Sequence, residues 1–92
     1  DQIAMEIQMA ANNYHAASEN VVQAKKEIDA ASAMQNAERE RFESGAVDFF
    51  VLNMREERAA DAQNKHIQSR LRLWLAIADY YLASLQAEKL KL

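Results

Sequence analysis

The segment Arg41-Phe-Glu-Ser-Gly-Ala-Val-Asp48 contains the only glycine, Gly45, near the middle of the 92 residues, and it determines where the chain turns. The chain has no proline, and glycine and proline interrupt helical patterns more strongly than other residues. The segments on both sides are rich in Ala, Leu, Glu, Gln, Arg and Lys, which favour helix. The sequence therefore predicts an all-α fold, a long antiparallel two-helix coiled-coil hairpin that turns at about residues 44–48.

The expected hairpin spans residues 1–92 as a single unit. Its helices are predicted over about residues 2–44 and 48–90, with residues 45–47 as the turn. Gly45 suits the position after a helix, where a left-handed backbone is needed and glycine carries no steric penalty. Asp48 is the expected N-cap, whose carboxylate accepts from the free N–H groups of the following turn.

Apolar residues alternate at spacings of four and three in both segments, which is the heptad pattern of coiled coils. Each segment also carries a second apolar face, so we expect each helix to contact two neighbours. We further expect Trp74 to face the small residues near Ala17 across the hairpin, and Leu71 to meet Val21. The first-segment line is Ile3, Ile7, Ala10, Tyr14, Ala17, Val21, Ala24, Ile28 and Ala31. The second-segment lines are Ala59, Ala62, His66, Ser69, Leu73, Ala76, Tyr80, Ala83, and Ile67, Leu71, Trp74, Ala78, Tyr81, Leu85.

Composition excludes several classes of function. The net charge is −3 with no basic face, which argues against a nucleic-acid partner. Cysteine is absent, so the chain has neither disulfides nor thiolate metal sites. The longest apolar run, residues 73–78, is far shorter than the roughly 20 residues of a membrane helix. Because two helices alone enclose no interior, we expect the hairpin to need a partner, either another copy or the rest of a larger protein. The sequence starts in mid-pattern and ends without a clear stop, so we interpret it as a fragment or a processed segment.

Catalytic and metal-binding patterns are also missing from the sequence. In the predicted hairpin, His15 and His66 lie roughly 14 Å apart along the axis, so they cannot share a metal ion. We find no nucleophile motif, phosphate-binding glycine loop or dinucleotide fingerprint. We therefore expect no enzyme activity, no metal and no cofactor. A helical enzyme that assembles its site from several chains, in the manner of a chorismate mutase, remains an alternative.

The turn region, Glu38-Arg-Glu-Arg-Phe-Glu-Ser-Gly-Ala-Val-Asp-Phe-Phe-Val-Leu-Asn-Met-Arg-Glu-Glu57, resembles the TolC-type outer membrane efflux and secretion proteins. Phe42 and Gly45 match the family's aromatic residue and the glycine three positions later. Ala78-Asp-Tyr-Tyr-Leu-Ala83 is similar to a closing motif of the same family. The resemblance covers nearly the whole chain and about one fifth of a typical member.

The resemblance implies that this chain is the second periplasmic helical hairpin of a trimeric outer membrane factor for multidrug efflux or type I secretion. The hairpin would form part of a periplasmic α-barrel, itself a soluble segment. Its tip would dock a periplasmic adaptor (membrane fusion) protein and act indirectly with an inner-membrane transporter. The implied docking residues are Ser44, Gly45, Ala46, Phe49 and Phe50. The implied polar network, which holds the tip closed or sets its charge, is Arg41, Asp48 and Arg55.

The main alternative is a self-associating structural antiparallel coiled-coil module with no transport role. The residues at the turn distinguish between the two hypotheses. A plain scaffold has no use for the aromatic pair Phe49-Phe50 beside a polar turn, whereas a docking tip does.

Overall fold

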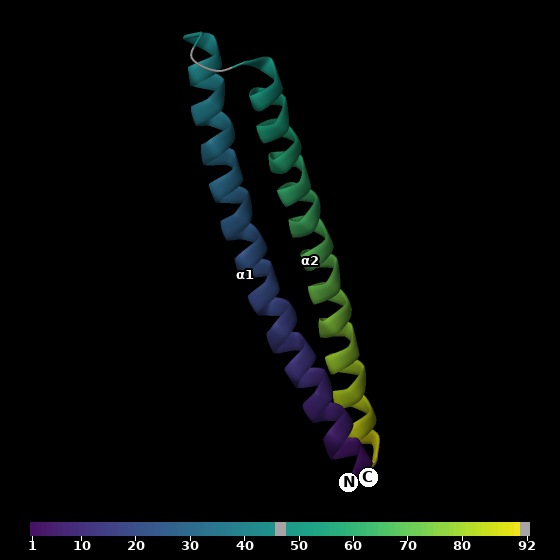
Figure 1. Ribbon diagram of the computed structural model, residues 1–92. Helices are drawn as coiled ribbons and strands as arrows, with labels where there is room; N and C mark the ends of the chain where they lie inside the picture. The colour runs from purple at the N-terminus through teal and green to yellow at the C-terminus, as the bar shows by residue number, and fades with distance from the viewer. Residues whose placement is uncertain (46–47, 91–92) are drawn as a thin grey trace. The chain divides into compact units, whose positions relative to one another are not determined.

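The computed structural model is all-α and describes residues 1–45 and 48–90. Helix α1 spans Gln2–Glu43 and helix α2 spans Phe49–Leu90, each of 42 residues (Figure 1). The sequence placed each helix end within one residue of these bounds. The predicted fold class, two long helices joined by a short turn, is confirmed.

Gly45 follows the first helix and has the left-handed conformation that the sequence predicts. Gly45 has φ of 81°, the left-handed conformation that L side chains rarely adopt. Its N–H donates to the Phe42 carbonyl at 3.0 Å, and the Ser44 N–H donates to the Glu40 carbonyl at 3.1 Å. These bonds satisfy carbonyls that the end of a helix leaves free.

Helix α2 begins with the predicted cap. Asp48 Oδ1 accepts a hydrogen bond from the Val51 N–H at 3.0 Å, and the Asp48 carbonyl accepts from the Leu52 N–H at 3.3 Å. The side-chain bond satisfies one of the free donors of the first turn, which confirms Asp48 as the N-cap.

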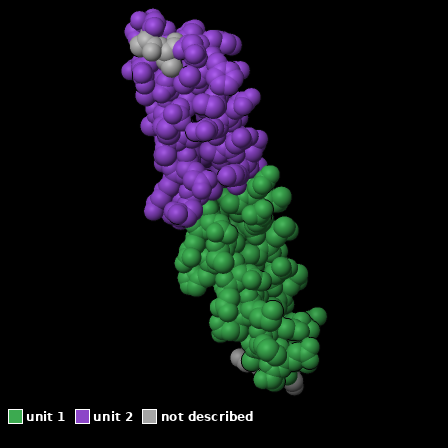
Figure 2. Space-filling model, in the orientation of Figure 1, with its two compact units in different colours: residues 1–21, 68–92 green, residues 22–67 purple. Residues whose placement is uncertain are grey.

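The two helices divide into two compact units (Figure 2). Unit 1 contains residues 1–21 and 68–92, and unit 2 contains residues 22–67, which include the turn. Each unit therefore consists of one part of α1 and one part of α2.

Small residues form the interior of both units. The buried residues are Ala10, Ala17, Ser69 and Ala76 in unit 1, and Ala24, Leu52, Ala59 and Ala62 in unit 2. All but Leu52 belong to the first heptad lines read from the sequence, and Leu52 extends the α2 line by one heptad. The heptad spacing of the interior is confirmed, but the sequence did not predict which of the two apolar lines of α2 faces inward.

The expectation that large residues of α2 pack onto alanines of α1 is wrong. Trp74 is 65% exposed, and Leu71 is exposed as well. Seven of the eight buried residues in the described part of the chain are alanine or serine, so small residues dominate the buried positions of both helices. A helix has one side toward its partner, and here the narrow alanine line takes it, which leaves the bulky second line outside.

The second apolar line of α2 is exposed along its whole length: Ile67, Leu71, Trp74, Ala78, Tyr81 and Leu85. Helix α1 also exposes apolar residues, among them Met5, Met9 and Val22. One aromatic contact joins the helices in unit 1, where the rings of Tyr14 and Tyr80 lie 6.3 Å apart. Both helices thus retain apolar surface that the chain itself does not cover.

Candidate partner-binding tip

The start of α2 presents aromatic side chains to solvent. Phe49 is 66% exposed and Phe50 is 74% exposed, whereas Leu52 is buried against α1. The Phe49 ring lies 6.1 Å from the Phe42 ring, tilted by 60°, so these two rings support each other across the turn. Four consecutive large apolar residues, 49–52, cannot all face one partner helix, and here only Leu52 is buried. The result is an exposed aromatic surface beside the turn.

The turn itself is sterically open at Gly45. A Cβ placed on Gly45 would meet no atom within 4 Å. The Ser44 hydroxyl donates to the Arg41 carbonyl at 2.9 Å and so completes the end of α1. Ala46, the third residue of the predicted docking turn, lies outside the described residues. Within the described part, Gly45 is open to solvent.

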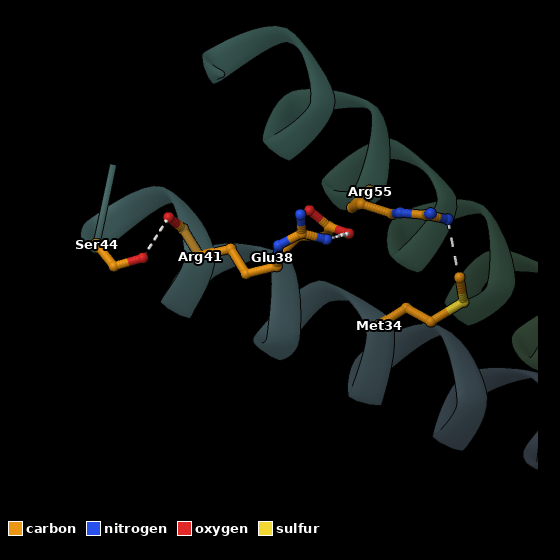
Figure 3. A network of polar contacts seen from close by, with 5 residues as sticks. All are labelled: Met34, Glu38, Arg41, Ser44 and Arg55. Atoms are coloured by element: carbon orange, nitrogen blue, oxygen red, sulfur yellow. Dashed lines mark hydrogen bonds and ion pairs between the residues drawn. The ribbon is translucent and has the colours of Figure 1, made fainter. Parts of the chain in front are cut away.

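The three residues of the predicted polar network have different partners, and Figure 3 shows those of Arg41 and Arg55. The Arg41 guanidinium lies 3.7 Å from Glu38, one turn earlier in α1. Asp48 caps α2. Arg55 Nη1 points at the sulfur of Met34, 4.0 Å away, across the two helices. The hydrogen bonds and ion pairs of the described residues therefore do not join these three side chains directly.

Sequence reasoning missed a charged residue in the seam between the helices. The Glu38 side chain is only 13% exposed. Its Oε2 atom and the Nε atom of Arg55 are buried without a hydrogen-bond partner. Glu38 occupies an inward position of the α1 heptad pattern, so the heptad count contained the signal. Burial of a carboxylate at such a position costs stability unless the group is paired and hydrogen-bonded.

A second feature that sequence reasoning missed is an ion pair across the helices. Arg39 Nη2 donates to Glu56 Oε1 at 2.8 Å, with both side chains about half exposed. Arg39, Arg41, Glu38 and Glu56 together make the helix ends next to the turn strongly charged. The tip thus combines exposed aromatic rings with charges of both signs.

Other site types find no support in the described residues. Residues 1–45 and 48–90 contain no group of three or more potential metal ligands. Neither described helix has an 18-residue stretch apolar enough to cross a membrane.

Comparison of this chain with protein-family models, with curated proteins and with solved structures finds no match.

Proposed function

We propose that this chain is a periplasmic α-barrel hairpin of a TolC-like outer membrane factor for multidrug efflux or type I secretion. In this proposal the hairpin is a non-enzymatic transport component without a cofactor. Its tip docks a periplasmic adaptor protein, and an inner-membrane transporter takes part through that adaptor. The proposal starts from the sequence resemblance at the turn and is supported by two features of the structure.

The observation that carries the proposal is the exposed tip. Phe49 and Phe50 stand in solvent beside a glycine turn with free space around it. Exposed aromatic residues next to a polar rim are typical of protein–protein contacts. An adaptor hairpin that approached the turn would bury these apolar rings. It would meet no steric hindrance from a side chain at Gly45.

The second support comes from the uncovered faces. A helix of a closed tubular wall has a neighbour on each side and needs two apolar faces. In α2 one face is the buried line through Ala62, Ser69 and Ala76, and the other is the exposed line through Leu71, Trp74 and Tyr81. The pattern supports a wall in which α2 packs both within the hairpin and against a neighbouring hairpin.

We assign the predicted polar residues different parts in this proposal. Arg41 is well exposed and lies close to the turn, so it is available to an approaching partner. Arg55 and the buried Glu38 lie deeper between the helices and influence the tip through the packing of its base. Asp48 acts by fixing the start of α2, and thereby the position of Phe49.

The sequence of the gene on both sides of this segment tests the proposal. We expect a second copy of the hairpin pattern upstream, with segments of alternating apolar and polar residues of the kind that form β-barrel strands. A reading frame that places the segment inside an unrelated helical protein would contradict the proposal.

The second candidate function is a self-associating structural coiled coil. The exposed outer line of α2 favours it, because this face is as apolar as an interface and is not covered by the chain. Light scattering of the isolated chain tests this candidate. A mass above that of one chain supports it, and a monomeric mass at high concentration contradicts it.

A further inference from the structure

The part of α2 in unit 1 carries a continuous apolar surface on its outer side, which we call the outer patch. Its members fall at three adjacent positions of one heptad register, so their side chains share one side of the helix. This side lies opposite the line through Ser69 and Ala76, which is buried against α1. The outer patch consists of Leu71, Trp74, Leu75, Ala78, Tyr81, Leu82 and Leu85, all exposed.

The outer patch is large enough to form an interface. Trp74 and Tyr81 are each about two-thirds exposed and together present on the order of 250 Å². The four leucines, Leu71, Leu75, Leu82 and Leu85, add a comparable area, which gives roughly 500 Å² per chain. That is near the upper end of the patches that monomers expose. Two copies face to face would bury about 1,000 Å², the area at which specific interfaces begin.

Charges beside the outer patch indicate the orientation of the partner. Arg72 and Asp79 lie seven residues apart on the same edge of the patch, and both are exposed. In an antiparallel pair centred between residues 75 and 76, Arg72 of each copy is level with Asp79 of the other, so two opposite-charge contacts form. In a parallel in-register pair, the two-fold axis places the two copies of this charged edge on opposite sides of the interface, so neither opposite-charge contact forms.

The same antiparallel register matches the shapes of the apolar residues. Trp74 of one copy is level with Ile77 of the other, but Ile77 is half-buried and lies outside the patch. The neighbouring patch residue is Ala78, one position along, so the bulky Trp74 ring meets a small residue and the layers interdigitate. Likewise, Leu71 of one copy lies within one residue of the level of Tyr81 of the other copy. Because a parallel pair would instead set the two Trp74 rings against each other, size and charge favour the same arrangement.

We propose that the outer patch binds a second copy of this chain, antiparallel, about a two-fold axis near residues 75–76. The interface is isologous, with the same residues contributed by both copies. The inference rests on the self-association candidate, for which it names the face and the orientation. It does not depend on adaptor docking, so its test uses the isolated chain without an adaptor.

A spin-label distance tests the orientation directly. The chain has no cysteine, so Gln86→Cys provides a single labelling site beside the outer patch. The antiparallel pair separates the two labels by about 30 Å along the helix axis, whereas a parallel in-register pair holds them within roughly 20 Å. A distance near 30 Å together with a dimeric mass supports the inference. The shorter distance, or a monomeric mass, overturns it.

Two sets of variants test the surface. Trp74→Glu should raise the dimer dissociation constant at least about tenfold, while circular dichroism shows the helices retained because Trp74 does not face α1. Val22→Glu is the matched control, since Val22 is also exposed but lies on α1 outside the patch. The charge reversal Arg72→Asp should weaken the dimer, and the double reversal Arg72→Asp with Asp79→Arg should restore it. Equal dissociation constants for Trp74→Glu, Val22→Glu and the unmodified chain overturn the inference, as does a double reversal no tighter than the single one.

Discussion

The guanidinium of Arg39 in α1 lies 2.8 Å from the carboxylate of Glu56 in α2, and this ion pair joins the two helices near the turn. Both side chains are about half exposed, so water and salt screen the attraction. We expect a double-mutant cycle with Arg39→Ala and Glu56→Ala to give a coupling free energy of about 0.5 kcal/mol at low salt. Urea unfolding measures it, and a coupling that does not decrease in about 1 M salt would show that the contact is not electrostatic.

Gly45 should stabilise the turn through its backbone conformation alone. A side chain there has open space, but φ of 81° is strained for any L residue. We expect Gly45→Ala to lower the free energy of unfolding by about 1 kcal/mol. Gly45→Asn should cost less, because asparagine tolerates the left-handed region. Equal losses for the two variants in thermal or urea unfolding would contradict a conformational origin.

Asp48 should stabilise α2 through its cap. Asp48→Ala removes the bond to the Val51 N–H and is expected to cost about 1 kcal/mol. Asp48→Asn is the matched control, since asparagine caps as well as aspartate and differs only in charge. Urea unfolding compares the two, and an unchanged stability for Asp48→Ala would mean that the cap contributes nothing.

Substitution of two adjacent alanines tests whether the helices pack closely through small residues. Ala59 is 4% exposed, whereas Ala60 faces solvent. We expect Ala59→Leu to destabilise the chain by about 1–3 kcal/mol, because the larger side chain must push the helices apart. Ala60→Leu, the same change one position later, should be close to neutral. If Ala59→Leu were as stable as Ala60→Leu in thermal unfolding, the small-against-small packing would be wrong.

We expect Glu38 to lower the free energy of unfolding of the hairpin. Its carboxylate is largely buried, one oxygen has no partner, and its contact with the exposed Arg41 is long at 3.7 Å. We expect Glu38→Met to raise the free energy of unfolding by about 1 kcal/mol, because an apolar side chain removes an unsatisfied buried charge. Arg41 is left in solvent, so its charge needs no replacement partner. A lower melting temperature for Glu38→Met would show that Glu38 has a favourable contact between the helices.

The sequence determined the fold well because its signals are local. One glycine, one capping aspartate and the absence of proline set both helix ends within a residue. The heptad count also identified the line through Ala17 and Ala24 as inward. It could not rank the two apolar lines of α2, because periodicity records where apolar residues recur and not which face lies nearer the partner. Trp74 was placed on the wrong side for this reason.

The contacts of the tip were less predictable. The heptad position of Glu38 indicates burial, but the ion pair of Arg39 with Glu56 depends on the register between the helices and on long side chains with many rotamers. Arg41, Asp48 and Arg55 are all close to the turn in sequence, yet each has a different partner. The exposure of Phe49 and Phe50 followed from the run of four apolar residues, which no single partner helix can cover.

We propose that the glycine turn docks a periplasmic adaptor, and Gly45→Asp in the full-length protein tests this docking. The variant adds a charged side chain at an open position while the helices remain. Adaptor pull-down and drug export are measured beside Ala60→Asp, an exposed change away from the turn. We predict that Gly45→Asp loses adaptor binding and export while Ala60→Asp retains both. Unchanged pull-down and export for Gly45→Asp would contradict the claim.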